Sequence, residues 1–272
     1  MTPLPILTDH RALDLHRRRA DPDALFLQSA AADEIQDRLD MVNRSFTSIA
    51  VVTPFPSVWA ARLPDARIVQ DQETLDLNAE AFDLVIHAIS LHWSNDPLGQ
   101  MIQCRRALRP DGLFLAAGLG GQTLTELRSC LGEAEVALTG GLSPRVAPMA
   151  EIRDLGALLQ RSGLALPVAD NQVLTVEYRD AWHLMRDLRH MGESNALQDR
   201  VRTPTRRSLF ADAAAHYEAH YSTAGGRVTA TFELIYLTGW AQDPNQQKPL
   251  RPGSAQQRLA AALATSETPL PD

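Results

Sequence analysis

The sequence predicts an α/β fold with a mainly parallel sheet, on the basis of two observations. Between about residues 48 and 138, short apolar runs alternate with segments that have the hydrophobic spacing of helices. This alternation is typical of βαβ units, in which a helix connects two parallel strands. The apolar runs are also nearly continuous, as expected of strands that helices cover on both faces.

The first half of the chain supplies the elements in a clear order. Residues 9–44 have helical spacing, and we expect a break at Asp21-Pro22. The next segments indicate a strand, a short helix and two further strands, in "SIAVV", "VWAARL", "ARIVQ" and "FDLVIHAIS". A helix is expected from Pro97, because proline suits a first helical turn, and "RPDG" at 109–112 has the residues of a turn.

The second half continues the pattern with the strand "LFLAAG" and the helix "TLTELRSCLGEAEVAL". Helices are expected near 150–163, 181–191 and 204–221, and strands in "QVLTVEY" and "VTATFELIYLTGWA". The tail after them is rich in Pro, Gln, Ser and Ala, so we expect it to be mobile except for a short helix at "AQQRLAAALA".

We therefore predict three parts of the chain. These are an N-terminal helical arm (1–45), a main domain (46–240) with a helical lobe at about 140–225, and a mobile tail (241–272). The length of 272 residues is enough for one such domain with an appended lobe.

Composition and charge narrow the function classes. With 44% hydrophobic and 22% charged residues the chain has the composition of a soluble globular protein, and its net charge of −7 argues against a surface devoted to nucleic acid. No apolar run is long enough to span a bilayer, and the first ten residues lack the pattern of a secretory signal. Cys104 and Cys130 have no metal-type spacing, so we expect buried thiols and a cytoplasmic protein.

Several separated blocks of the sequence resemble one known family. "FDLVIHAISLHWSND" and "LRPDGLFLAA" resemble the fourth and fifth strands of a class I methyltransferase fold. The other blocks are "DHRALDLHRRRA", "GGQTLTELR", "GGLSPRVAP", "DLGALLQRSG", "MGESNAL" and "ATFELIYLTGW". Together they resemble the respiratory complex I assembly factor family of methyltransferase-like proteins, which is related to the biotin-pathway malonyl-carrier-protein methyltransferase.

This resemblance implies a Rossmann-like sheet of seven strands that binds S-adenosylmethionine beyond the carboxyl ends of its strands. It also implies a role in maturing a subunit of respiratory complex I, and hence a protein partner or protein substrate. One mitochondrial member of the family is associated with hydroxylation of an arginine on that subunit.

The segment after the first strand departs from the family pattern. Family members have a glycine-rich loop of the Asp-x-Gly-x-Gly type there, whereas this chain has "VVTPFPSVW". Its two prolines remove two amide donors, and Phe55 and Trp59 add bulk. We therefore expect a degenerate cofactor loop at Thr53, and either aromatic ring filling the cofactor volume would argue against an enzyme that uses S-adenosylmethionine.

A shortened sequence accompanies this change. The family fits two strands between the loop and "FDLV", ending in a ribose-binding acid and an adenine-side acid, but Asp71 is the one obvious candidate here. It lies 18 residues after Thr53 and 11 before Phe82, which fits either role. We infer that a strand and a helix are lost, so that the sheet is truncated on one side.

Five residues are the candidates for a site. By the resemblance, Asp71, Ser90 and Leu91 would lie nearest any bound S-adenosylmethionine. The candidates for catalysis are His92, whose imidazole can exchange a proton near neutrality, and Glu193. Packing of the strand–helix junction is the favoured explanation of both His92 and Trp93, whereas helix capping or a surface ion pair explains Glu193 equally well.

Other patterns are less specific. Glu126 and Arg128 fit either a substrate cavity or surface pairing, and Arg17–Arg19 either the cofactor mouth or a solvated helix face. His216 and His220 lie one helical turn apart, but Tyr217 stands where a zinc protease needs a glutamate, so we expect no metal site.

Two functions are compatible with these observations. The first is an S-adenosylmethionine-dependent, methyltransferase-like protein that acts in the maturation or assembly of a complex I subunit. The second is a catalytically inactive protein of the same fold that binds a partner through "LHWSND", "GGQTLTELR" and "MGESN". Whether the chain is an active enzyme is left open by the missing glycine loop.

Overall fold

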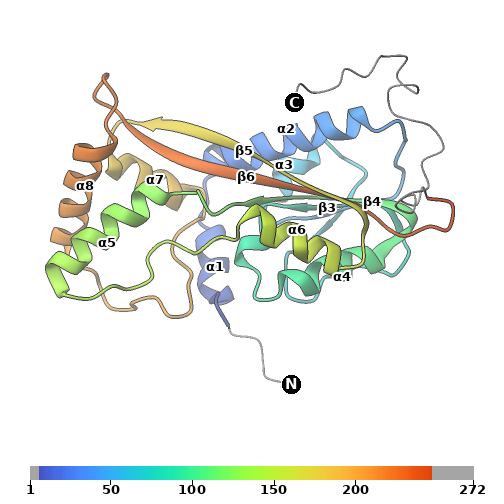
Figure 1. The fold of residues 1–272 in the computed structure, drawn as a ribbon, viewed down its shortest axis with the longest axis horizontal. Coiled ribbons are helices and arrows are strands. Elements are labelled where there is room, and N and C mark those ends of the chain that lie inside the picture. Colours follow the sequence, from blue (N-terminus) through green and yellow to red (C-terminus); the bar gives the residue numbers. More distant parts are fainter. Residues whose placement is uncertain (1–5, 247–272) are drawn as a thin grey trace, which may run out of the picture. The chain divides into compact units, whose positions relative to one another are not determined.

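The fold is built on one mixed sheet of six strands, in the order β2-β1-β3-β4-β6-β5 (Figure 1). The computed structural model describes residues 6–246, of which those up to Gln242 form one unit. The strands are β1 (Ile49–Val52), β2 (Arg67–Val69), β3 (Phe82–Ala88), β4 (Leu108–Leu119), β5 (Ala165–Tyr178) and β6 (Val228–Trp240). The first four strands are mutually parallel, whereas β6 runs antiparallel to both β4 and β5.

The expected truncation of the sheet is confirmed. β2 has three residues and forms one edge of the sheet, next to β1. Between β2 and β3, residues 70–81 contain no helix or strand. The sheet therefore has six strands among the described residues instead of the seven that the resemblance implied.

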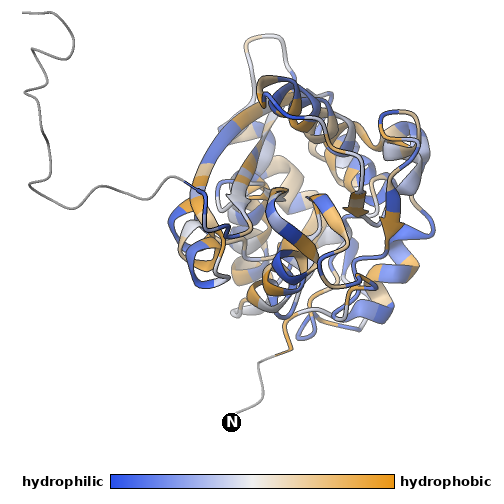
Figure 2. Cartoon of the chain, turned by 90° about the vertical axis from the view of Figure 1, so that its right-hand side faces the viewer, coloured by the Kyte–Doolittle hydropathy of each residue, from blue (hydrophilic) through white to orange (hydrophobic). Residues whose placement is uncertain are grey.

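Helices cover both faces of this sheet. They are α1 (His10–Arg17), α2 (Phe26–Met41), α3 (Pro56–Ala60), α4 (Pro97–Ala107), α5 (Thr125–Thr139), α6 (Ile152–Arg161), α7 (Ala181–His190) and α8 (Arg207–Tyr221). One hydrophobic core joins the sheet to α2, α3, α5, α7 and α8, and the other joins it to α4 and α6. Most helices alternate hydrophobic and hydrophilic stretches, as helices with one buried side do (Figure 2). Cys104 and Cys130 are free, buried thiols, one in each core, as predicted.

Several expected boundaries differ from the observed ones. The "RPDG" segment lies inside β4 instead of forming a separate turn: the β3–β4 register shifts there, and Asp111 has φ of +59°. The turn residues thus form a bulge within a longer strand, because the pairing resumes at Leu113. β5 begins at Ala165 instead of near Gln172. The predicted short helix in the tail lies outside the described residues.

The segment expected to be a helical lobe is divided between three places. α7 and α8 pack together, and α8 packs on α5, at the end of the sheet where β4 stops (Figure 1). α6 packs instead with α4 on the opposite face, and β5 belongs to the sheet. The cause is that β5 and β6 are long and antiparallel, so they carry the chain along the whole sheet between these helices.

The N-terminal arm is attached to the segment that follows α7. Thr8 forms a β-bridge with Leu197, and the Asp9 carboxylate accepts a hydrogen bond from the Ala12 amide at the start of α1. The same carboxylate lies 2.9 Å from Arg200. The chain breaks after α1, where a short 3₁₀ helix starts at Pro22, as the sequence predicts. The arm thereby brings the carboxyl end of α1 over the ends of the parallel strands.

Candidate functional site

The first part of the site is the β1–β2 end, formed by Thr53, Phe55 and Asp71 at the carboxyl ends of β1 and β2, with Arg17 facing them. The Thr53 amide donates to the Val69 carbonyl at 2.9 Å, and the Phe55 amide donates to Thr53 Oγ1 at 3.1 Å. Pro54 between them has no amide hydrogen. The backbone here therefore offers no free donor from Thr53 to Phe55 with which to hold a ligand.

Asp71 lies two residues after the end of β2 and is already paired inside the protein. Its Oδ2 lies 2.8 Å from Arg17 Nη1, and the two side chains are 9% and 8% exposed, respectively. β2 pairs with β1, so Asp71 lies just beyond the carboxyl end of the strand beside β1, and a ribose-binding role for it stays a prediction. Arg17 Nε and Nη2 are buried without a partner.

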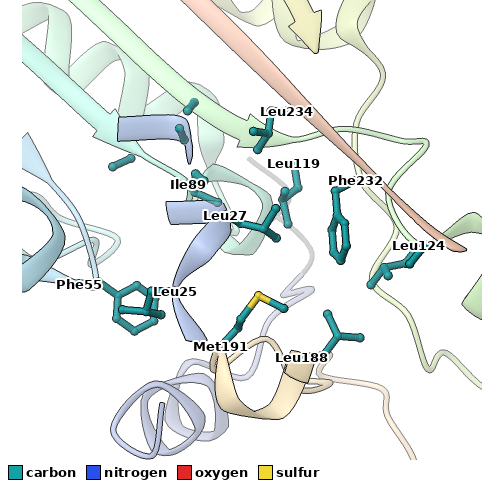
Figure 3. Packing of buried hydrophobic residues seen from close by; sticks show 14 of the residues in the cluster. Leu25, Leu27, Phe55, Ile89, Leu119, Leu124, Leu188, Met191, Phe232 and Leu234 are labelled. Carbon is teal, nitrogen blue, oxygen red and sulfur yellow. The ribbon is translucent and has the colours of Figure 1, made fainter. Parts of the chain in front are cut away.

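Two aromatic side chains of this loop fill the core. Phe55 is 7% exposed and lies against Leu25 near the start of α2 (Figure 3), and Trp59 is 1% exposed. Together with the paired Asp71 and the missing amide donors, this packing does not fit S-adenosylmethionine held in the manner of the fold family. The space at this end is a polar hollow of about 630 Å³, lined by Arg17 and Asp71 themselves and by other charged side chains such as Glu73.

The end of β3 forms the middle of the site. Ile89 has φ of +32°, which a β-branched residue rarely adopts, and such strain costs about 1–3 kcal/mol. Ser90 and Leu91, predicted to lie near a cofactor, are both buried. Ser90 Oγ lies 3.5 Å from His87 Nδ1, and His87 Nε2 lies 2.6 Å from Gln100 Oε1. Burial lowers the pKa of His87, so it is a neutral hydrogen-bonding group near neutral pH.

The two candidates for catalysis lie in contact. His92 Nε2 is 3.3 Å from Glu193 Oε2, and the indole Nε1 of Trp93 donates to the same oxygen at 2.7 Å. Burial by itself raises the pKa of Glu193, but the hydrogen bonds from His92 and Trp93 and the charge of Arg17 outweigh burial, so the pKa is lowered. Glu193 is therefore a buried carboxylate that stays ionised near neutral pH.

Gly192 makes this placement of Glu193 feasible. It has φ of +79°, which favours glycine, and an added Cβ would lie 3.1 Å from the Cα of Arg17. The end of α7 can thus approach α1 closely. As a result, Arg17 of the β1–β2 end and Glu193 lie near one another across the mouth of the sheet.

A cavity of about 460 Å³ opens beside Glu193, and we name it the α5–α7–α8 cavity. Its walls are mainly apolar side chains from these helices and from the ends of β4 and β6, among them Leu119, Leu124, Leu188 and Phe232 (Figure 3). Trp93 and Glu193 supply polar atoms on its wall. An apolar cavity with few convergent polar groups is the usual form of a binding site.

Comparison with known proteins decides the family. The methyltransferase domain family matches residues 26–116. The protein named "Arginine-hydroxylase NDUFAF5, mitochondrial" of Danio rerio is 38% identical over 216 residues, which are 79% of this chain and 67% of that protein. The chain belongs to the NDUFAF5 family. The fold is accordingly that of a class I, Rossmann-like methyltransferase, as predicted.

Two further matches place this family in context. A malonyl-[acyl-carrier protein] O-methyltransferase of Xylella fastidiosa (strain M23) is 34% identical over 178 residues, which cover 65% of this chain and 58% of that protein. The crystal structure of a Bacillus halodurans protein described as a methyltransferase matches with a TM-score of 0.49 and 13% identity, over 77% of this chain and 98% of that one. This chain spans 43% of the NDUFAF5 protein of Dictyostelium discoideum and 56% of that of Homo sapiens, about half of their length.

The other predicted residues lie elsewhere in this NDUFAF5-family chain. Glu126 accepts hydrogen bonds from the amide and the hydroxyl of Thr231 and so joins α5 to β6, and Arg128 donates to the carbonyl oxygens of Thr123 and Ala147. Neither lines the α5–α7–α8 cavity. Of the arginine run, Arg17 faces the β1–β2 end, whereas Arg18 and Arg19 are exposed.

The paired histidines of α8 have a different environment from that of a metal site. His216 and His220 stack with ring centroids 6.3 Å apart, and His216 Nδ1 lies 3.4 Å from Glu133. Among residues 6–246, no three side chains that bind metals come together, and no helix is long and apolar enough to cross a membrane.

Sequence reasoning missed two contacts of this family member. It did not predict that Arg17 pairs with Asp71, because a run of three arginines carries no signal of which one is buried. It also did not predict that the indole of Trp93 donates to Glu193. The signal for that contact was the presence of "LHWSND" and "MGESN" among the blocks that carry the resemblance.

Proposed function

We propose that this chain acts in the maturation or assembly of a respiratory complex I subunit, and that it acts on an arginine side chain of a protein client. The proposal takes the type of side chain from the name of its relatives, arginine-hydroxylases. The observation that carries it in this chain is the ionised Glu193 carboxylate on the wall of an apolar cavity. The chain matches about half the length of the Dictyostelium discoideum and Homo sapiens relatives. Their activity is therefore proposed for this chain and not transferred to it.

The site chemistry suits an arginine. A guanidinium binds best to a carboxylate, and its aliphatic stem packs well against apolar walls. His92 and Trp93 hold one oxygen of Glu193, while Oε1 makes no hydrogen bond with any side chain in the described part of the protein. Oε1 is therefore the atom that we assign to the client guanidinium. Addition of an oxygen atom to that side chain would need an oxidant as co-reactant, and the residues named here hold the arginine.

We assign S-adenosylmethionine no role in this activity. The methyltransferase-type domain is of a kind that binds this cofactor, and the paired Asp71 and the packed Phe55 argue against the usual binding mode in this chain. The relatives are named as mitochondrial proteins, and a cytoplasmic location for this chain stays a prediction. Binding of nucleic acid is not part of the proposal.

The alternative function is a catalytically inactive partner-binding assembly factor. The pairing of Asp71 with Arg17 at the β1–β2 end is the observation in its favour, whereas the hydroxylase name of the relatives disfavours it. The two functions differ in one measurable respect. An active chain changes the mass of its client, and an inactive one changes the amount of assembled complex I alone.

The test is to delete the gene in the organism that encodes it and to complement with the wild type or with Glu193→Gln. We expect peptides of complex I subunits from wild-type cells to carry one additional oxygen on an arginine, and those from deletion and Glu193→Gln cells to lack it. Arg153→Gln on the opposite face of the sheet is the matched control and should restore the oxygen. An unmodified arginine in wild-type cells, with complex I lost on deletion, would support the inactive factor.

A further inference from the structure

The surface around the mouth of the α5–α7–α8 cavity is basic, although the chain as a whole is acidic. Residues 179–207 carry seven arginines and four acidic residues, against a net charge of −7 for the chain. Arg186 and Arg189 of α7 line the cavity and are exposed. Neither forms a salt bridge within residues 6–246, although the charge of Arg186 helps to lower the pKa of Asp180.

Apolar surface continues from this mouth in two directions. A second hollow of about 640 Å³ lies beside the cavity and shares Leu131, Arg145 and Val146 with it. On its wall, Val136 and Leu142 are 51% and 73% exposed. On α7, Trp182 lines the cavity and is 38% exposed. We treat the two neighbouring hollows, which share three lining residues, as one groove; it is mainly apolar and carries Arg186 and Arg189 on its α7 side.

We propose that this groove binds a protein segment in which acidic and apolar residues flank a single arginine. The acidic residues would meet Arg186 and Arg189, and the apolar residues would cover Val136, Leu142 and Trp182. This inference rests on the proposed function, because the arginine is assigned to Glu193. The inference adds which residues flank the client arginine and which surface of this protein binds them.

The basic rim would select among arginine-bearing segments. A buried carboxylate such as Glu193 attracts any cationic side chain that can reach it. Arg186 and Arg189 repel a segment with several cations, while a segment with acids beside its one arginine gains attraction at both places. Specificity for an arginine in acidic surroundings therefore follows from having opposite charges inside the cavity and at its rim.

The test uses three synthetic peptides and measures their binding to the full chain by fluorescence anisotropy. Each has one arginine and the same leucines, and the flanking positions carry glutamate, glutamine or lysine. We expect the glutamate peptide to bind about tenfold more tightly than the glutamine peptide, and the lysine peptide more weakly than both. The preference should weaken with added salt.

Two variants separate this inference from the proposed function. Arg186→Glu with Arg189→Glu should abolish the preference for the glutamate peptide, whereas the double-charge control Arg153→Glu with Arg161→Glu on α6 should keep it. Equal affinity for the three peptides, or a preference that the α7 variant retains, would overturn the inference. If binding follows the flanking charge but is unchanged in Glu193→Gln and with arginine replaced by citrulline, the docking surface stands and the proposed function fails.

A second copy of this chain is the competing occupant. Sedimentation of the wild type and the α7 variant measures it directly. A dimer that the α7 variant loses, together with no preference among the peptides, would overturn the proposal in favour of self-association.

Discussion

The β1–β2 end and the α5–α7–α8 cavity differ in the partners of their buried carboxylates. At the β1–β2 end, Asp71 pairs with Arg17, two of whose nitrogen atoms are buried without a partner. At the α5–α7–α8 cavity, Glu193 is held by two donors through one oxygen, and the residue lines the cavity. The same fold thus pairs a carboxylate inside the protein beside a polar hollow at one end, and keeps a carboxylate on the wall of an apolar cavity at the other.

The comparison teaches where the fold tolerates change. The strand β2 and the loop after β1 lie at an edge of the sheet, so a shorter sequence there alters few neighbours. The cavity is walled by α5, α7, α8 and β6, of which α8 contacts the other three, and loss of any one would open the core. We expect the two ends to respond differently to substitution and to ligand.

The largest effect on stability is expected at the β1–β2 end. Arg17→Met leaves Asp71 buried without its partner, and breaking a buried pair in this way costs about 3–5 kcal/mol of unfolding free energy. Urea unfolding followed by circular dichroism measures it, with the exposed Arg18→Met as control. The double variant Arg17→Met, Asp71→Asn should recover most of the loss. A change below about 0.5 kcal/mol in the single variant would contradict a structural role for the pair.

The next largest effect concerns the buried pair of Glu135 and Arg145 beside the α5–α7–α8 cavity. Glu135 of α5 accepts hydrogen bonds from the amide and hydroxyl of Ser143 and from Arg145, which lines the cavity. Burial alone raises the pKa of Glu135, but these bonds outweigh it and lower the pKa to about 2. The folded-state pKa is thus below the unfolded value of 4.5, so the pair stabilises the fold above that pH.

This stabilisation should be lost as the pH falls from about 4.5 towards 2. Thermal unfolding across that range measures it, and up to about 3 kcal/mol should depend on Glu135. Glu135→Gln should be less stable than the wild type at neutral pH and should show a smaller loss on acidification. Parallel curves for the two proteins would contradict the assignment.

The smallest effect is expected for S-adenosylmethionine itself. Because Phe55 is packed and Asp71 is paired, titration calorimetry should detect no binding of S-adenosylmethionine or S-adenosylhomocysteine up to millimolar concentration. Micromolar binding that Asp71→Ala abolishes would show instead that the β1–β2 end accepts the cofactor in an altered mode. The Arg17–Asp71 pair and the packing of Phe55 would then describe the ligand-free protein alone.

The amino-acid sequence by itself determined the class of fold and the missing parts of it. Apolar runs such as "SIAVV" and "FDLVIHAIS" can be buried only as strands of a covered sheet, and the short stretch between Thr53 and Phe82 has no room for a further strand and helix. These are local properties of the chain, set by periodicity and length. The absence of glycine after β1 likewise follows from the sequence alone.

The tertiary structure alone decided which charged residues meet. Arg17 and Asp71 are 54 residues apart, and His92 and Glu193 are 101 apart, so no local pattern relates them. Their contacts depend on α1 docking against the segment after α7, through Thr8 and Leu197. The same docking distinguishes the buried Arg17 from the exposed Arg18, because burial of a side chain depends on what packs over it and not on its neighbours in sequence.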